Sequence, residues 1–288
     1  MVTSTPEGIS TSRGTACGSA PCAPEATIDG NDAPDAPMRR SSVSRSNATS
    51  RSVRPARPRP RTTSSAASAS SAAAVLADAA FEEVVGAGIV GRTERDVALD
   101  LEIAMRRRGA EGVSFPPIVA AAEHGARPHA VPRDVPIPPN TLVVVDWGAQ
   151  LDGYASDCTR TVATGPLDPR DEAIYETVLV AQEAALKAVR AGPSGREIDA
   201  VARTIIDDAG HAEHFGHGLG HGVGMEVHEG PRLGKTSEDA IAAGNIVTVE
   251  PGIYVPGAIG VRIEDLVVVT DEGCEVLNTL PKDLRTVG

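Results

Sequence analysis

Apolar residues first recur with a helical period in the segment "SAAAVLADAAFEEVVGAG", residues 71–88. The high Ala content and the four-residue spacing of Val75, Ala79 and Glu83 are typical of a helix. Glycines near the end of the segment are residues that commonly follow a helix C-terminus. The pattern therefore predicts a helix that ends just before residue 86.

A second helix is predicted directly after the first. Thr93 is an N-cap candidate, and Asp96 lies three residues later, where an acidic side chain supports a helix start. Gly109 marks the expected end. The apolar stripe predicted for this helix is Val97, Leu101 and Met105.

Strand-like runs follow, and the same order then repeats. The runs "GVSFPPIVAAA", "TLVVVDWGAQ" and "YASDCTRTVATG" come first; helical patterns in "DEAIYETVLVAQEAALKAVRAG" and "SGREIDAVARTIIDDAG" then precede further strands in "GNIVTVEPGIYV" and "GVRIEDLVVVT". Both halves read helix, helix, strands. We therefore expect an α+β fold with a pseudo-two-fold internal duplication and a site where the two halves meet.

The N-terminal quarter has a different composition from the rest of the chain. Residues 1–66 are rich in Ser, Ala, Pro and Arg and contain no periodic apolar pattern, so we expect a disordered head followed by an ordered domain at 67–288. Residues 1–72 carry a net charge of +4, which leaves −16 on the remainder of a chain whose total is −12. An acidic body argues against a nucleic-acid partner.

The cysteines and the apolar runs indicate a cytoplasmic protein. The 4 cysteines form no CxxC pair and no dense framework, which favours free thiols in a reducing compartment. No apolar run approaches the roughly 20 residues needed to span a bilayer. The N-terminus also lacks the apolar centre of a signal peptide. A membrane partner is therefore not expected.

Acidic residues stand in facing pairs on two predicted hairpins. A hairpin that turns near Asp152-Gly153 sets Asp146 and Asp157 across from each other, within a residue or two of register. A hairpin that turns at Pro256-Gly257 pairs Glu250 with Glu264. Opposed buried carboxylates cost several kcal/mol unless something positive lies between them.

Such acids predict a site for divalent cations. Four carboxylates and one histidine could hold two ions, and this donor set favours Mn²⁺, with Co²⁺ or Zn²⁺ as alternatives. The segment "HGLGHGVGMEVHEGP", residues 217–231, offers three histidines, one as a metal ligand and the others for a substrate. Its glycines are expected to leave room for a peptide beside the backbone.

The motifs that carry this chemistry resemble a known family. "SFPPIVAAAEHGARPHA", "VVVDWGAQLDGYASDCTRTV", "HGLGHGVGMEVHEGPRLG" and "TVEPGIYVPGAIGVRIEDLVVVT" stand in the same order as in pita-bread-fold dinuclear metallopeptidases. They look most like the branch of Xaa-Pro dipeptidase (prolidase) and aminopeptidase P. The resemblance covers roughly residues 67–286, nearly all of the predicted ordered body.

The resemblance implies a role for each matching residue. Two metal ions share a bridging water, which is the nucleophile, and Glu250 moves its proton to the leaving amine. His228 contacts the scissile carbonyl, and His129 touches the substrate and leaving group. His217 and Arg262 match substrate-facing or supporting positions, and Arg262 is expected to orient Glu264 or to form a structural ion pair. The implied metal ligands are Asp146, Asp157, His221, Glu250 and Glu264.

His124, His211 and His214 match no functional position of the family pattern and are expected to be ordinary surface residues. Cys158 should point to the strand face opposite Asp157 and pack in the core. Members of the family usually carry a further N-terminal domain, which generally helps to form a dimer and to wall the substrate pocket; residues 1–66 occupy its place. The resemblance makes a homodimer one expected assembly, and weaker activity is one expected consequence of a missing domain.

The resemblance implies an exopeptidase that hydrolyses the bond between an N-terminal residue and proline. Methionine aminopeptidase shares the fold and ligand types, but "HGVGMEVHEGP" and "GVRIED" look more like the Xaa-Pro branch. A creatinase-like hydrolase without metal and an inactive binding module are further alternatives. The presence of all five ligand positions argues against both.

Overall fold

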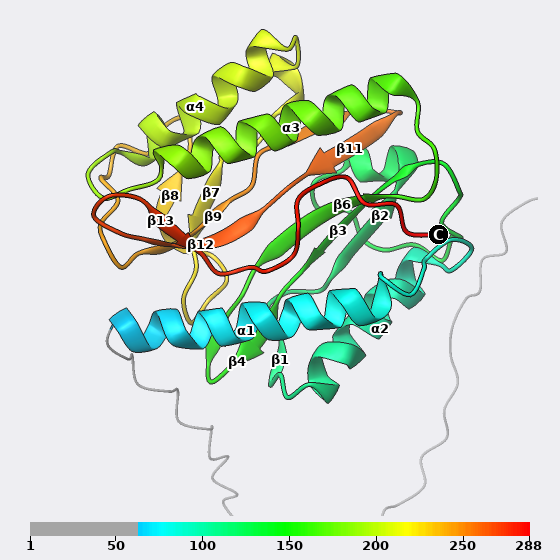
Figure 1. Ribbon diagram of the computed structural model, residues 1–288, viewed down its shortest axis with the longest axis horizontal. Helices are drawn as coiled ribbons and strands as arrows, with labels where there is room; N and C mark the ends of the chain where they lie inside the picture. The colour runs from blue at the N-terminus through cyan, green and yellow to red at the C-terminus, as the bar shows by residue number, and fades with distance from the viewer. Residues whose placement is uncertain (1–62) are drawn as a thin grey trace, which may run out of the picture. The chain divides into compact units, whose positions relative to one another are not determined.

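The computed structural model describes residues 63–288, so most of the predicted head lies outside the described residues. Residues 63–66, predicted to be disordered, are helical instead. The described chain contains four α-helices and two short 3-10 helices (Figure 1). The helices are α1 (Thr63–Val84), α2 (Glu94–Arg107), η1 (Ala122–Ala126), α3 (Pro169–Ala188), α4 (Gly195–Asp208) and η2 (Ala212–His214).

The strands pair in four sheets with the orders β1-β4-β5, β2-β3-β6, β10-β11 and β13-β12-β9-β7-β8. The first half of the body contributes β1 (Gly112–Val113), β2 (Ile118–Ala121), β3 (Leu142–Trp147), β4 (Ala149–Leu151), β5 (Tyr154–Ala155) and β6 (Cys158–Ala163). The second half contributes β7 (Gly220–Gly222), β8 (Glu229–Leu233), β9 (Ile246–Val249), β10 (Gly252–Val255), β11 (Ile259–Arg262), β12 (Asp265–Val269) and β13 (Cys274–Val276).

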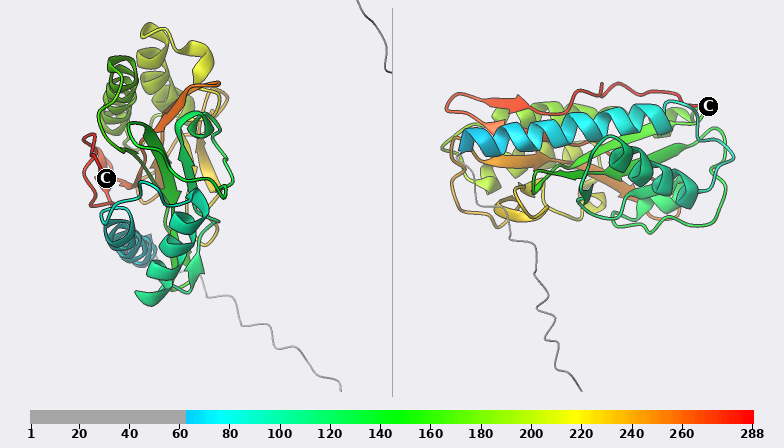
Figure 2. Two further views of the ribbon diagram at one scale, coloured as in Figure 1. Left: turned by 90° about the vertical axis from the view of Figure 1, so that its right-hand side faces the viewer. Right: turned by 90° about the horizontal axis from the view of Figure 1, so that it is seen from below.

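The predicted repetition of helix, helix and strands is confirmed. In Figure 1, α3 and α4 lie side by side along one edge of the strands, and α1 and α2 lie along the opposite edge; the left view of Figure 2 shows the strands between the two helix pairs. One apolar cluster joins α1 and α2 to β3 and β6, and another joins α3 and α4 to the second-half strands. The strands between the helix pairs therefore have cores on both sides.

The helix signals in the sequence differ in how well they predict the buried face. In α2 the Thr93 side chain accepts a hydrogen bond from the Asp96 amide, and the predicted apolar stripe is fully buried. In α1 the helix is confirmed, but Val75 is 47% exposed, and residues such as Ala77 and Phe81 are buried instead. An Ala-rich helix carries only a weak apolar stripe, so its composition does not define which face packs.

The first predicted hairpin is confirmed with a small offset. Strand β3 pairs with β6, and the residue opposite Asp146 is Thr159, two positions beyond Asp157. Asp157 itself lies just before β6, in the stretch where Gly148 meets the backbone of Ser156 too closely for any Cβ. The strand turn thus brings Asp146 and Asp157 to neighbouring positions.

The second hairpin has the predicted register. Gly252 pairs with Arg262 in β10–β11, and Val249 pairs with Asp265 in β9–β12. The same register on both sides places Glu250 opposite Glu264 between these pairs. Both acids lie where the chain leaves one sheet and enters another, so neither belongs to a strand. This break in the ladder leaves both side chains room to turn toward a shared point.

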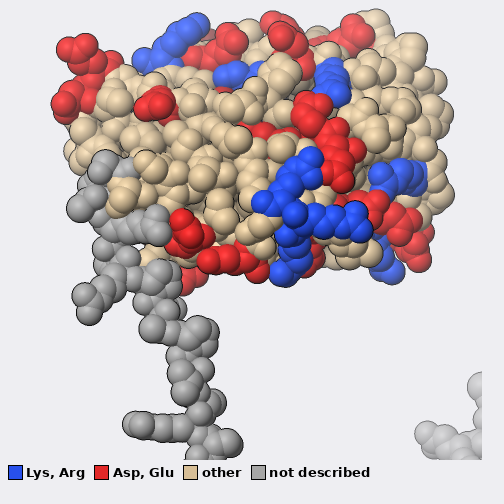
Figure 3. Space-filling model, turned by 60° about the horizontal axis from the view of Figure 1, so that its bottom comes forward, with Lys and Arg blue, Asp and Glu red and all other residues tan. Residues whose placement is uncertain are grey.

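The outer surface carries mixed charge. Figure 3 shows the lower face of the body, on which basic side chains lie against acidic ones. Ion pairs along α1 and α2 include Arg106–Glu102 and Arg108–Glu83. Among residues 63–288, no helix combines the length and the apolar character needed to cross a membrane.

Candidate metal centre

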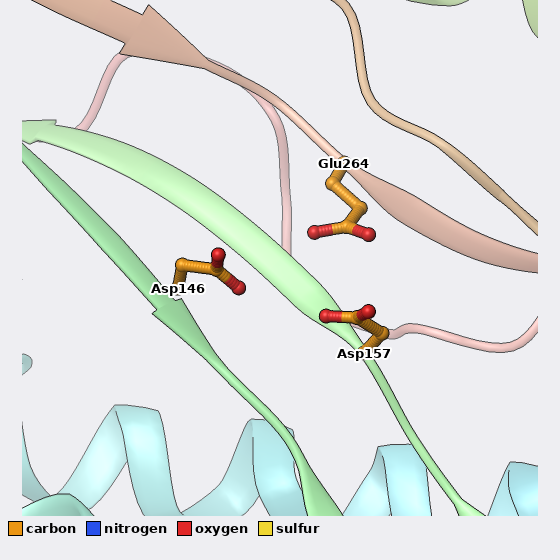
Figure 4. Close-up of side chains that lie close together, drawn as sticks. All are labelled: Asp146, Asp157 and Glu264. Atoms are coloured by element: carbon orange, nitrogen blue, oxygen red, sulfur yellow. The ribbon is translucent and has the colours of Figure 1, made fainter. Parts of the chain in front are cut away.

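Three carboxylates from three separate segments converge in the middle of the body. Asp146 comes from β3, Asp157 precedes β6, and Glu264 lies between β11 and β12 (Figure 4). One oxygen of each side chain lies within 4.8 Å of the others, and Asp157 and Glu264 are buried. A cluster of this size matches the reach of carboxylates that share a cation.

His221 and Glu250 adjoin this cluster. His221, on β7, places Nε2 3.2 Å from Glu250 Oε1 and 3.6 Å from Asp157 Oδ2. Its Nδ1 lies 3.1 Å from the carbonyl oxygen of Gly222, which leaves Nε2 facing the acids. Burial raises the pKa of Glu250, but the hydrogen bond and charge of His221 outweigh burial and lower that pKa to about 2. The structure thus brings all five predicted metal ligands together.

The donor set can be tested against a cation by its unpaired oxygens. Asp146 Oδ1 and Glu264 Oε1 are buried and have no hydrogen-bond partner among residues 63–288. Burial raises the pKa of Asp157 well above its usual range, and the charges of Glu264, Asp146 and Glu250 raise it further. A buried carboxylate without a donor is costly by several kcal/mol. Divalent cations would satisfy both the oxygens and the charge, so the residues fit a metal centre.

Arg262 is bound to Asp146, and its expected contact with Glu264 is indirect. Arg262 Nη2 lies 2.5 Å from Asp146 Oδ2, and its Nε donates to Thr159 Oγ1 at 3.0 Å. The Thr159 hydroxyl in turn donates to Glu264 Oε2 at 2.7 Å. Arg262 therefore reaches Glu264 only through Thr159, and the ion pair expected as its alternative role is present with Asp146, in the other half of the body.

The predicted histidines surround the cluster at different depths. His217 Nε2 lies 3.0 Å from the hydroxyl of Tyr254, which accepts a hydrogen bond from Arg262 Nη1 at 2.7 Å. The ring of His228 is 4.4 Å from that of His221, measured between centroids, and His228 is exposed. His129 is also exposed, on the segment between β2 and β3.

These histidines lie close enough together to affect one another. The charge of His129 contributes to lowering the pKa of both His217 and His228, although burial is the largest cause for each.

The glycines around His221 have a different role from the one expected. A Cβ at Gly220 would lie 2.0 Å from the carbonyl oxygen of Thr248, and one at Gly222 would lie 2.1 Å from that of Gly230. The space beside these glycines is filled by the chain's own backbone, and the prediction that they make room for a peptide is wrong at these two positions. They allow close strand packing instead.

His124 is not a surface residue. Its side chain is 3% exposed, and Nδ1 lies 2.9 Å from Glu94 Oε2. The expectation was wrong because its partner, Glu94, stands 30 positions earlier in the chain.

Cys158 packs in the core as predicted, and burial raises the pKa of its thiol well above the usual value.

Three polar residues of the site were missed: Thr159, Thr248 and Tyr254. The Thr248 hydroxyl donates to Glu250 Oε1 at 3.0 Å, and the hydroxyls of the other two connect Arg262 to its neighbours. Thr159, Thr248 and Tyr254 each lie an even number of residues from a predicted ligand on the same strand run. Side chains on one face of a strand recur every second residue, and this signal could have identified them.

Solved structures of proline-specific peptidases are similar to this chain. An X-Pro aminopeptidase from Thermotoga maritima superposes with a TM-score of 0.76 at 39% identity, covering 80% of this chain and 65% of that one. A prolidase from Pyrococcus furiosus superposes with a TM-score of 0.75 at 38% identity, covering 78% and 66% respectively. The predicted pita-bread fold is thereby confirmed.

Curated relatives agree with the structures. An Xaa-Pro dipeptidase from Pyrococcus furiosus is 42% identical over 206 residues, which are 72% of this chain and 58% of the relative. One from Lactobacillus delbrueckii subsp. lactis is 42% identical over 212 residues, 73% and 58% of the two chains. The chain thus spans less than two thirds of the length of these relatives.

The family itself follows from a match over most of the chain. Residues 69–271 match the description "Metallopeptidase family M24". The matched range includes all five acidic and histidine side chains that converge in the structure. The chain belongs to metallopeptidase family M24.

Proposed function

We propose that this chain is a metal-dependent exopeptidase that hydrolyses the bond between an N-terminal residue and proline, as an Xaa-Pro dipeptidase or an Xaa-Pro aminopeptidase. The observation that carries the proposal is the convergence of Asp146, Asp157 and Glu264 beside His221 and Glu250. The names of the similar proteins support the substrate class.

The proposed cofactor is a pair of divalent ions. Oxygen donors with one imidazole favour Mn²⁺, and Co²⁺ and Zn²⁺ are compatible with the same donors. When bound, the ions supply a hydroxide nucleophile at neutral pH and polarise the scissile carbonyl. The residues that would hold them are Asp146, Asp157, His221, Glu250 and Glu264.

The remaining chemistry is proton transfer and orientation by side chains. Glu250 is proposed to take a proton at a carboxylate oxygen and deliver it to the leaving amine of proline. His228, exposed beside His221, would donate to the oxyanion that develops at the carbonyl. His129 would contact the substrate at the leaving group. His217 would orient the substrate, and Arg262 would orient Asp146.

Hydrolysis assays on the Mn²⁺-loaded protein test this proposal. Three substrates suffice: a Gly-Pro dipeptide, a longer Xaa-Pro peptide and a Met-Ala peptide. Cleavage of either proline substrate at least 100-fold faster than Met-Ala would support the proposal, and the ratio of the first two separates dipeptidase from aminopeptidase. Preferential cleavage of Met-Ala would instead favour methionine aminopeptidase. No cleavage of any of the three would contradict an exopeptidase.

A cytoplasmic location and a homodimer belong to the same proposal. The location is supported by the free thiols of Cys158 and Cys274 in the described residues. Fractionation of cells that express a tagged chain tests the location. Light scattering on the purified protein tests the dimer, for which a mass near twice 29.6 kDa is expected.

A further inference from the structure

We propose that a buried carboxylate on each second helix, paired with an arginine, fixes the loop that carries a substrate-facing histidine. Glu94 and Arg133 form the first pair, which positions His129; Asp199 and Arg203 form the second, which positions His217. The inference rests on the proposed function, which places both histidines at the substrate. The four paired residues touch no metal ligand and act as positioning residues.

The first pair closes the loop between β2 and β3. Glu94, at the first position of α2, is 1% exposed and accepts hydrogen bonds from Ala121, just before this loop, and from Arg133 within it. Its Oε1 accepts from the Ala121 amide at 3.0 Å and from Arg133 Nη2 at 3.0 Å, and its Oε2 accepts from the Arg133 amide at 2.9 Å. His124 Nδ1 lies 2.9 Å from the same oxygen. One carboxylate thus binds residues on both sides of His129.

A third contact holds the middle of the same loop. The carbonyl oxygen of Pro128, next to His129, accepts a hydrogen bond from Arg262 Nη1 at 3.2 Å. Gly125 packs so closely on Gly260 of β11 that a Cβ on Gly260 would lie 1.8 Å from the Gly125 carbonyl oxygen. Glu94 therefore completes a set of contacts around His129, and its loss would release the chain on either side of that histidine.

The second pair holds the segment after α4. Arg203 donates to Asp199 Oδ2 at 2.8 Å and to Oδ1 at 2.9 Å, and both side chains are at most 10% exposed. The same guanidinium donates to the carbonyl oxygen of Phe215 at 2.9 Å and to that of His217 at 2.8 Å. Asp199 also accepts from the Leu219 amide at 3.0 Å.

Ring contacts extend this second pair to the imidazole itself. The Arg203 guanidinium lies 4.0 Å from the centroid of the Phe215 ring. The Phe215 ring meets that of His217 edge-on, with centroids 5.1 Å apart. His217 is therefore held through its backbone and through its ring.

The chemistry of both pairs requires a carboxylate. The Ala121 amide, the Arg133 amide and the Arg133 guanidinium all donate to Glu94. An amide nitrogen in place of one carboxylate oxygen would therefore direct its own N–H at another donor. Burial raises the pKa of Glu94, but hydrogen bonds from Arg133 and the backbone outweigh burial and lower that pKa below its usual value. Glu94→Gln and Asp199→Asn therefore remove the charge and one of the two accepting oxygens while they keep the shape of the side chain.

Crossed double-mutant cycles on the metal-loaded full chain test the inference. Glu94→Gln and Asp199→Asn are each combined with His129→Ala and His217→Ala, and kcat/KM is measured with an Xaa-Pro peptide. Each single pair variant should lower kcat/KM about 10-fold. In the His129→Ala background, Glu94→Gln should lower kcat/KM by less than a further 2-fold, whereas in the His217→Ala background its full loss should appear. Asp199→Asn should show the reverse pattern, because only residues that act as one unit have non-additive effects.

A structural role alone gives a different result. Losses that multiply in all four combinations, or pair variants with unchanged kcat/KM, would overturn the inference. Asp78→Asn is the matched control: Asp78 is a buried carboxylate that accepts from the Thr279 amide and from Asn278, away from both loops. It should lower the melting temperature without coupling to either histidine. If the primary variants fail to fold, Arg133→Lys and Arg203→Lys provide milder forms of the same cycles.

A second readout separates this inference from the proposed function. If the wild-type chain cleaves no Xaa-Pro peptide, the proposed function fails, but the ring ¹⁵N resonances of the histidines still report on the loops. In the Zn²⁺-loaded protein, Glu94→Gln should shift the His129 resonances and leave those of His217 in place, and Asp199→Asn should do the opposite. Equal shifts in both histidines, or none, would overturn the inference.

Discussion

The two hairpins that supply the four acids differ in which residue lies opposite each acid. In the first half, Asp146 and Asp157 are staggered by two positions, so Asp146 lies opposite the neutral Thr159. In the second half, the register places Glu250 directly opposite Glu264, an arrangement in which like charges destabilise the pair. The second hairpin therefore depends more heavily on partners from outside it.

Those partners come from the other half of the body or from another strand. Thr159 of the first half donates to Glu264, and Arg262 of the second half binds Asp146. His221 of β7 lies against Glu250. Each half thus supplies a group that the acids of the other half require, so the metal centre forms only when the halves pack together. The changes below weaken one side of this arrangement at a time.

The largest effect is expected at Glu250, which is assigned to both metal binding and proton transfer. Glu250→Gln should lower kcat by at least about 1,000-fold, because general acid–base catalysis alone contributes about 10²–10⁴-fold. The fold should be retained, as judged by circular dichroism. Glu272→Gln, at an exposed position, is the matched control. Activity of Glu250→Gln within 10-fold of wild type would reject its role.

An intermediate effect is expected at the contact between the halves. Lysine keeps the charge of Arg262 but cannot reach Asp146, Thr159 and Tyr254 at once, since it lacks the planar fork. Arg262→Lys should lower kcat/KM about 10–100-fold and weaken Mn²⁺ binding in a titration. An unchanged Mn²⁺ affinity together with unchanged kcat/KM would show that Asp146 does not need this partner.

The second hairpin offers a test in which removing a charge stabilises the protein. Without metal, Glu264→Gln should raise the free energy of unfolding by about 1 kcal/mol, or about 2–4 °C in Tm, because it relieves repulsion with Asp157 and Glu250. With excess Mn²⁺ the wild type should become the more stable of the two proteins, since ion binding stabilises its folded state more than that of the variant. A lower Tm for the variant in both conditions would contradict this account of the acids.

The smallest effect is expected from the N-terminal head. Deletion of residues 1–60 leaves every described helix and strand, beginning with Thr63 of α1. The truncated chain should therefore hydrolyse an Xaa-Pro peptide with a kcat/KM within about 2-fold of the full chain. A much larger loss would show that the head contributes to the pocket or to assembly.

Local signals predicted much of this molecule. The turn at Pro256-Gly257 determines which residues pair along the whole hairpin. That Glu250 lies opposite Glu264 could therefore be inferred without knowledge of the fold. The N-cap at Thr93 was equally local. The convergence of both hairpins with His221 came from the resemblance of whole motifs to a family, because no spacing in one sequence places three distant segments together.

Contacts between distant segments were the part that escaped prediction. Arg262 binds a residue 116 positions away, and no pattern within its own strand distinguishes that partner from Glu264 two positions later. His124 looked like a surface residue because its acidic partner Glu94 sits on another helix. Such pairs depend on how the elements pack, which a single sequence does not specify.

Metal analysis of purified protein tests the central claim most directly. After loading with Mn²⁺ and removal of free ion, elemental analysis by mass spectrometry should find two ions per wild-type chain. Asp157→Asn and Glu264→Gln should each hold fewer, while Glu272→Gln should hold two. Wild-type protein that retains no more metal than a variant lacking all five side chains would contradict the account.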